Sequence, residues 1–166
     1  MAYEFYVTIK GTTQGKFKGE SSREGHKEKI AGLKFGYELK SPRDIATGQA
    51  SGKRQHNPVS FTKEWGPSSP MIFQACATNE VLTDVLFEFI KTDPNGKEVI
   101  YHKIKLTNAT VANIKQYTGG GDASASSAKT TATYDTHELE DVSMTFQKIE
   151  IENVPGKTEA GDDWKA

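Results

Sequence analysis

One helix signal stands in a chain whose other segments read as strands, and it lies inside the stretch Asn57–Leu106. Ser69 is of a type that caps helix N-termini, and Pro70 suits the first helical position because it has no N–H to leave unpaired. About two mostly apolar turns follow, and Asn79 is suited to end them in the left-handed conformation. The stretch therefore predicts one short helix. Its apolar side would be Met71, Ile72, Phe73, Ala75 and Cys76.

A strand and a hairpin flank this helix. Val59–Lys63 is a short run of strand-forming residues before it, and Val81–Lys91 and Val99–Leu106 are two longer runs after it. Asp93-Pro94-Asn95-Gly96 joins the two longer runs, and Asn-Gly favours the positive φ angles of tight hairpin turns. The middle of the chain is therefore expected to run strand, helix, hairpin.

Alternation of apolar and polar residues marks further half-buried strands. Near Gln147–Lys148 the apolar residues change parity, which indicates a bulge or a change of packing partner. The further strands are expected at Tyr3–Ile9, Ile30–Leu39, Asn108–Tyr117 and in a long final segment through Val142 and Ile151.

Many short strands and a single helix predict a mainly β fold. We expect an antiparallel β-barrel of two packed sheets, with one short α-helix on its side. The chain has 166 residues, which fits one domain. This domain is expected over residues 1–152, followed by a flexible tail over residues 153–166.

Composition argues against several classes of protein. Lys+Arg 21 against Asp+Glu 22 gives a net charge of -1, whereas a nucleic-acid-binding domain is usually basic on one face. No run approaches the roughly 18 apolar residues of a membrane span. The start, MAYEFYVTIK, lacks the pattern of a signal peptide, and the single Cys76 rules out an intrachain disulfide. We therefore expect a protein made and folded in the cytoplasm, without nucleic-acid binding or membrane insertion, which could still leave the cell by a route that accepts the folded form.

No group of residues has the spacing of a catalytic or metal site. Cys76 lies on the apolar side of the predicted helix, where a buried thiol is expected rather than a nucleophile. Glu150 and Glu152 alternate with isoleucines and indicate the wet face of a strand. No catalytic, cofactor-binding or metal-binding residue is expected, and an enzyme is the least favoured class. The histidines, none at metal-ligand spacing, are His26, His56, His102 and His137.

Several short segments, in one order and spacing, carry a family resemblance. They are Gly19-Glu20-Ser21 with His26, Ile30–Phe35, Ser60-Phe61-Thr62-Lys63, Ser69-Pro70 with Phe73-Gln74-Ala75-Cys76-Ala77, Lys103–Leu106, Val111–Ile114, and Glu140–Phe146 with Ile149. Together they resemble the haemolysin co-regulated protein family, Hcp, over roughly residues 3–152. Two features depart from the family: the first turn, GTTQGKFKGES, is longer, and Trp65-Gly66-Pro67 replaces a more acidic stretch.

The resemblance implies a fold shared with phage tail tubes and a structural function. Six copies would form a ring, and stacked rings would form the inner tube of the bacterial type VI secretion system. Contraction of a sheath would propel this tube outward, so spike and sheath proteins would be partners. The lumen would carry or shield small effector proteins. The protein would itself be secreted to the extracellular space or a target cell, and no cofactor is implied.

The strand Ile30–Leu39 is expected to line the lumen of such a ring. A small, polar lumen face would let cargo slide without gripping it. This face would be Lys34, Gly36 and Glu38. By the same alternation, the side chains packed inward would be Leu33, Phe35, Tyr37 and Leu39.

Residues 41–58 show no periodicity, and a long loop in a compact domain is usually functional or disordered. We expect this loop to project to the ring face and contact the next ring. The alternative is a merely disordered loop. The residues expected to make the stacking contact are Arg43, Asp44, Lys53 and Arg54.

A second interpretation comes from another class of protein: a small-ligand or carbohydrate-binding β-barrel. Trp65 and nearby tyrosines would then stand at the mouth of the barrel. Packing of Trp65 against the barrel is the simpler role for this ring. Subunit number separates the two interpretations, because the tube requires a six-membered ring.

Overall fold

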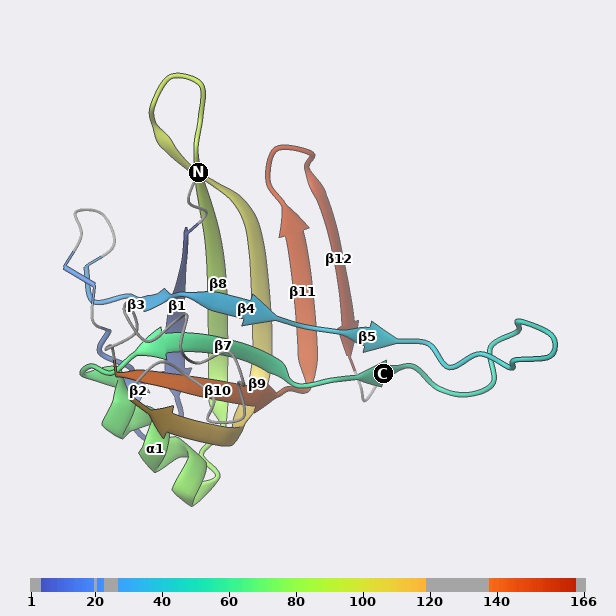
Figure 1. Cartoon of the computed structure of the whole chain (residues 1–166), viewed down its shortest axis with the longest axis horizontal. Helices are drawn as coiled ribbons and strands as arrows, with labels where there is room; N and C mark the ends of the chain where they lie inside the picture. The colour runs from blue at the N-terminus through green and yellow to red at the C-terminus, as the bar shows by residue number, and fades with distance from the viewer. Residues whose placement is uncertain (1–3, 20, 23–26, 119–137, 164–166) are drawn as a thin grey trace, which may run out of the picture.

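The computed structural model describes residues 4–19, 21–22, 27–118 and 138–163 (Figure 1). Within these ranges the chain forms one helix and a series of strands. In chain order they are β1 (Glu4–Gly11), β2 (Gly15–Lys16), β3 (Ile30–Gly32), β4 (Lys34–Gly36), β5 (Leu39–Lys40), β6 (Gln55–His56), β7 (Val59–Glu64), α1 (Ser68–Thr78), β8 (Leu82–Thr92), β9 (Glu98–Tyr117), β10 (Leu139–Thr145), β11 (Lys148–Asn153) and β12 (Thr158–Asp163).

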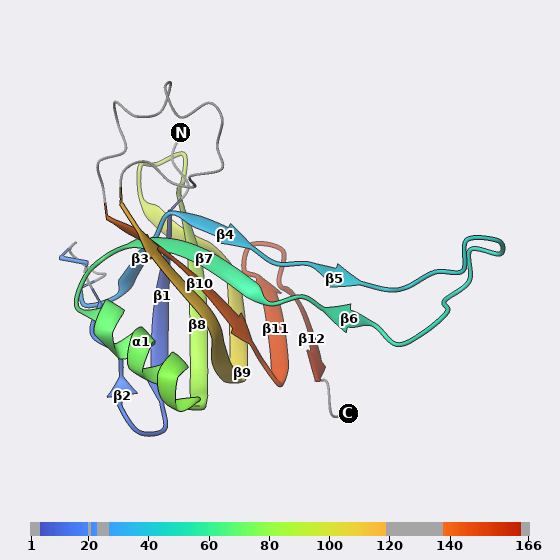
Figure 2. The same ribbon diagram turned by 60° about the horizontal axis from the view of Figure 1, so that its bottom comes forward.

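The strands form two layers that cross at a steep angle (Figures 1 and 2). The β8 sheet contains β3, β1, β8, the first half of β9, β11 and β12, and the β7 sheet contains β4, β7, β10 and the second half of β9. Every pairing among these strands is antiparallel. The helix lies beside the two sheets. The prediction of a mainly β, antiparallel fold with one helix on its side is confirmed.

Strand β9 belongs to both sheets because it changes face at one residue. Leu106 and Ala109 are both buried, although alternation would place them on opposite faces. Asn108 between them has a φ of 51°, in the left-handed region.

 This left-handed backbone turns the strand, and the break between β10 and β11, which both pair with β9, lies at the same level. The Asn108 side-chain amide donates to Gln147 Oε1 at 3.0 Å and joins the two breaks. The parity change expected near Gln147–Lys148 is therefore the point where the chain passes from one sheet to the other.

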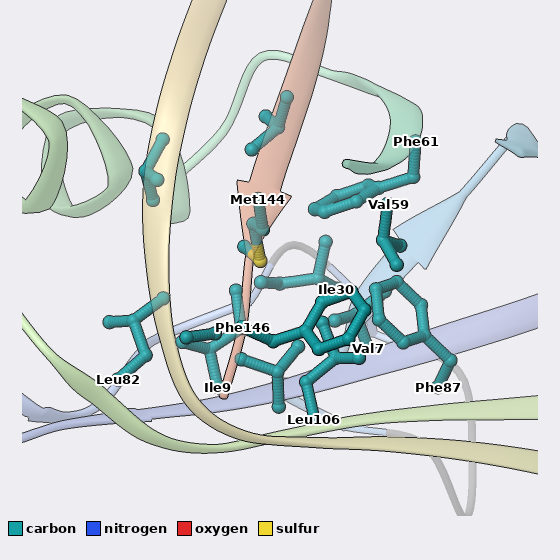
Figure 3. Packing of buried hydrophobic residues seen from close by; sticks show 14 of the residues in the cluster. Val7, Ile9, Ile30, Val59, Phe61, Leu82, Phe87, Leu106, Met144 and Phe146 are labelled. Carbon is teal, nitrogen blue, oxygen red and sulfur yellow. The ribbon is translucent and has the colours of Figure 1, made fainter. Parts of the chain in front are cut away.

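The core fills the space between the two sheets (Figure 3). Val7 and Ile9 of β1 and Leu106 of β9 face Val59 and Met144 of the β7 sheet, and all five are fully buried. Burial of large apolar side chains is the main source of stability for such a fold. Among the described residues, no helix is long and apolar enough to cross a membrane.

Helix α1 begins two residues earlier than its sequence signal indicates. Pro67, not Ser69, occupies the N-cap position, and no side chain caps the helix there. Asn79 ends the helix with a φ of 56°, as its residue type predicts. Ile72 and Ala75 pack into the core, but Phe73 is 59% exposed because it lies on the outer side of the helix. Phe73 therefore does not belong to the apolar side as expected.

The segment expected as one strand, Ile30–Leu39, is divided between three partners. Strand β3 pairs with β1, β4 with β7, and β5 with β6, so the segment crosses from one sheet to the other. Phe35 and Tyr37 pack against the core as expected. Leu33 and Leu39 are 58% and 51% exposed, so their expected inward packing is wrong. Leu33 and Leu39 lie on either side of β4, where the chain moves away from the core. Alternate residues there no longer face one buried side.

Residues 158–163 are more ordered than their composition indicates. Residues 158–163 form β12, which pairs with β11 in register from Asn153↔Thr158 to Lys148↔Asp163. A flexible tail is therefore the wrong description of this part. The sequence TEAGDD has little apolar character, and its strand exists because β11 offers a free edge to pair with.

Candidate functional site

A polar trough lies on the face of the β7 sheet that points away from the core. In β7, Val59 and Phe61 point into the core, so Ser60 and Thr62 point to the opposite face. The hollow has a volume of about 660 Å³. Residues lining it from four strands include Lys34, Gly36, Ser60, Thr62, Lys115, Asp141 and Ser143.

Several of the polar side chains that line the trough contact one another. The Thr62 hydroxyl donates to Asp141 Oδ1 at 2.6 Å, and the Tyr117 hydroxyl donates to the same oxygen at 3.3 Å. The Lys115 ammonium lies 5.8 Å from the centre of the Tyr117 ring. No histidine or cysteine is among the lining residues. The surface therefore presents hydroxyl, carboxylate and ammonium groups that are suited to weak polar contacts.

Two of the three residues expected to face a lumen lie in this trough. Lys34 pairs with Thr62 and Gly36 with Ser60 across β4 and β7. Glu38 lies outside the trough, where its carboxylate accepts a 2.7 Å hydrogen bond from Asn57 Nδ2. A Cβ added at Gly36 would approach nothing closer than Ser60 Oγ at 3.6 Å. A side chain at position 36 would therefore project into the trough without displacing the backbone.

The loop expected to contact a next ring is an ordered arm. The arm, residues 39–56, begins with the paired strands β5 and β6 and projects beyond both sheets (Figures 1 and 2). Near its tip, Gly48 N–H donates to Asp44 O at 2.7 Å, and Arg43 pairs with Ala50. Ile45 is fully exposed there. An isolated two-stranded hairpin is marginally stable in water, so the arm is suited to dock on another surface.

The four predicted stacking residues have different environments in the arm. Arg43 and Lys53 are exposed on its outer part. The Asp44 carboxylate accepts the Ala46 N–H at 2.9 Å and so helps to shape the tip. Arg54 is at the base, where it forms an ion pair with Asp162 of β12. Two of the four are therefore already engaged within the chain.

A cluster of polar side chains joins the base of the arm to β12, and we call it the arm-base cluster. Asp162 Oδ2 lies 2.6 Å from His56 Nε2, and the Tyr37 hydroxyl lies 2.6 Å from His56 Nδ1. Arg54 Nε donates to the Asp162 carboxylate, and Arg54 Nη2 donates to Asp163 O at 2.9 Å. Sequence reasoning missed this cluster because it treated the tail as flexible.

Charge and burial shift the ionisation of this cluster. The hydrogen bond from Arg54, together with that from His56, holds the pKa of Asp162 below its usual range. Burial, followed by the nearby Asp162 charge, raises the pKa of Tyr37. Tyr37 therefore stays a hydroxyl and Asp162 a carboxylate at neutral pH, which are the forms that the hydrogen bonds require.

A buried ion pair connects the β7 sheet to α1. Lys63 and Glu140 are both fully buried, and their side chains form a salt bridge. Lys63 Nζ also donates to Glu64 O at 2.6 Å. Ser69 Oγ and Gln116 Nε2 donate to the two Glu140 oxygens at 2.6 and 2.9 Å. These hydrogen bonds connect the buried pair to β9 and to the first turn of α1.

Strand alternation contains the signal for this pair. Lys63 has the parity of Val59 and Phe61, and Glu140 has the parity of Val142. Opposite charges at inward positions of paired strands predict a buried ion pair, because a buried charge requires a partner. The strands' register places them together, since Glu140 lies opposite Lys63.

Glu80, just after α1, holds the turn between β1 and β2. Its carboxylate accepts the backbone N–H groups of Thr13 and Gln14, both at 3.0 Å, and the Gln14 side-chain amide at 3.0 Å. A Cβ at Gly11 would lie 2.0 Å from Glu80 Oε2, so this approach requires glycine. Burial opposes ionisation of Glu80, but the hydrogen bonds from Gln14 and Thr13 outweigh it and lower the pKa. Glu80 therefore fixes the turn between β1 and β2.

Glu80→Gln is expected to lower the free energy of unfolding by about 1–3 kcal/mol at neutral pH, because an amide cannot accept all three donors. The folded-state pKa lies below the unfolded value of about 4.3, so the carboxylate's contribution is complete above that pH. It is lost as the pH falls through the folded-state pKa. Urea denaturation at neutral and acidic pH measures both effects. Glu159→Gln, at an exposed glutamate, is the control, and an equal loss there would contradict the role of Glu80.

The remaining candidates are Cys76, Trp65 and the histidines outside the arm-base cluster. Cys76 is partly exposed and has no disulfide partner. Trp65 Nε1 donates to Leu139 O at 2.7 Å, and the ring is 42% exposed. In the described part of the chain, no three His, Cys, Asp or Glu side chains lie close enough together to hold a metal ion. His26 and His137 lie outside the described residues.

Comparisons with known proteins point to one family. Residues 6–152 match the family described as "Type VI secretion system effector, Hcp". A Pseudomonas aeruginosa protein named "Major exported protein" is 31% identical over 175 residues, covering 100% of this chain and 98% of its own length.

Solved structures show the same similarity at the level of the fold. A structure named "Crystal structure of Hcp protein" has a TM-score of 0.84 at 27% identity and covers 98% of this chain and 100% of its own. A mutant Hcp1 from E. coli EAEC 042 has a TM-score of 0.82 at 27% identity, covering 98% and 99%.

Proposed function

The chain belongs to the Hcp family of type VI secretion proteins, and on this premise we propose that it is a structural subunit of the secretion tube. Six copies form a ring, and the rings stack into a tube that is propelled out of the cell. Spike and sheath proteins of the machine are its partners. The exported relative supports a protein that is made inside the cell and then leaves it.

The two edges of the β7 sheet support a ring. Among the described residues, β4 pairs with β7 alone, and residues 110–117 of β9 pair with β10 alone. A sheet edge presents unpaired backbone N–H and C=O groups that can pair with another chain. The two edges are unlike, so one can meet the other on a neighbouring copy in a heterologous contact, which closes into a ring if the rotation fits.

The polar trough supports a lumen that carries effectors. If edge meets edge, the β7 sheets of successive copies continue around the ring, and their troughs face the same side. The trough presents small and hydroxyl side chains, among them Gly36, Ser60 and Ser143. Such a surface contacts a protein cargo without binding it irreversibly, because it offers no large apolar patch.

Subunit number tests the proposal directly. Native mass spectrometry of the purified protein is expected to show a six-subunit species, with ring-shaped particles in negative-stain images. A monomer at all concentrations would contradict it. A monomer that binds sugars would instead favour the carbohydrate-binding alternative.

Gly36→Trp is expected to leave rings intact and to reduce effector retention by about tenfold or more, a loss equivalent to ~1.4 kcal/mol. The indole would fill the trough, and a Cβ there meets only Ser60 Oγ at 3.6 Å. Co-purification of effectors with the ring measures retention. Lys105→Trp, on the exposed outer face of the β8 sheet, is the control. Intact rings with unchanged retention would show that the trough does not face the cargo.

A further inference from the structure

The arm-base cluster connects two segments that are more than a hundred residues apart in the chain, Arg54–His56 and Asp162. In Figure 1 the end of β12 reaches the point where the arm leaves the sheets. His56 is the centre of the cluster, and its side chain is only 1% exposed. The charged partners are more accessible, since the side chains of Arg54 and Asp162 are 39% and 30% exposed.

The chemistry of the side chains determines which atom donates and which accepts in each hydrogen bond of the cluster. The Asp162 carboxylate can only accept, so His56 Nε2–H donates to it. In the neutral imidazole, Nδ1 then accepts from the Tyr37 hydroxyl. The Phe146 ring lies edge-on to the imidazole, with centroids 5.3 Å apart, and fixes its plane. The imidazole is therefore held on both nitrogens and on its face.

The rest of the arm makes hydrogen bonds chiefly within itself. Beyond the base, Asp44 N–H donates to Gln49 O at 2.7 Å, and Ser51 N–H donates to Pro42 O at 3.0 Å. These bonds shape the tip but do not fix its direction relative to the sheets. Among the described residues, side-chain hydrogen bonds that join the arm to a strand of the β8 sheet lie at its base, in the arm-base cluster.

We propose that Asp162 is a positioning residue for the arm: through His56 and Arg54, the C-terminal strand β12 sets the direction in which the arm leaves the body. The arm then meets its partner surface already oriented, which lowers the entropy lost on docking. The positioning concerns the single subunit. Only its consequence for ring stacking rests on the proposed function.

Acid is expected to release this contact. The charged and titratable groups around Asp162 are Tyr37, Arg54 and His56 on the arm side, and Lys148, Glu150, Glu159 and Asp163 on β11 and β12. Because the folded-state pKa of Asp162 is lowered, the contact is complete above the unfolded value of about 3.9 and is lost as the pH falls through the folded value. The arm is therefore anchored at neutral pH.

Hydrogen exchange of the purified protein tests the proposal in Asp162→Asn. Amides at the base, residues 38–40 and 55–57, are expected to exchange about tenfold faster at neutral pH. The tip amide of Gly48 and the amides of β8 should keep their rates, which separates lost positioning from general unfolding. Glu159→Gln removes a charge from the same strand outside the cluster and should change base rates less than about twofold. Tyr37→Phe should give an intermediate increase.

Unchanged base rates in Asp162→Asn would overturn the proposal, and so would equal acceleration in Glu159→Gln or acceleration of tip and base together. Native mass spectrometry of the same samples reports ring formation separately. Absence of rings in the unmodified protein would count against the proposed function, whereas the exchange rates would still decide the role of Asp162.

Discussion

Lys63→Met is expected to lower the free energy of unfolding by about 3–5 kcal/mol. The substitution leaves the Glu140 carboxylate buried without its cation, and Ser69 and Gln116 supply only neutral donors. A loss of this size is a large part of the roughly 5–15 kcal/mol that stabilises a domain. Urea denaturation at fixed protein concentration measures it.

The double variant Lys63→Met with Glu140→Gln separates the pair from simple loss of packing. A neutral amide can still bond to Gln116 and Ser69, so the double variant is expected to be more stable than Lys63→Met alone. Lys105→Met is the exposed control and should change stability by less than about 1 kcal/mol. A double variant less stable than Lys63→Met would show that the pair is not the source of the loss.

Deletion of residues 45–52 is expected to abolish tubes while leaving single rings. The deletion removes the tip with the fully exposed Ile45, but it keeps β5, β6 and the arm-base cluster. Electron micrographs of the purified protein measure stacking, and native mass spectrometry measures rings. Appearance of the protein in the medium of a strain with an active secretion machine gives a second measure. Normal tubes and export would contradict the stacking role of the arm.

Full-length variants show whether charge contributes to stacking. Arg43→Glu with Lys53→Glu reverses the two exposed cations of the outer arm. Each exposed ion pair contributes only ~0.2–1 kcal/mol, so stacking should weaken rather than vanish, and most clearly at low salt. Thr47→Ala keeps the arm's length and charge and is the control. Equal stacking in all three proteins would leave the apolar tip as the contact.

Much of the β7 sheet could be predicted from local alternation. Ser60 and Thr62 alternate with Val59 and Phe61, so the polar face of the trough follows from the pattern once the strand is recognised. The same pattern failed at Leu33 and Leu39, which lie where the chain changes partners. Alternation reports a buried face only while a strand stays in one sheet, and the sequence does not show where a strand changes sheets.

The sequence by itself determined the strand-rich class, the single helix ended by Asn79, and the absence of motifs for catalysis. These depend on residues close together in the chain, whose φ preferences and periodicity act locally. Only the tertiary structure decided that TEAGDD is a strand, that Lys63 meets Glu140, and that Asp162 holds the base of the arm. Each of these joins segments far apart in sequence, and a long-range contact exists only when the whole fold brings its two sides together.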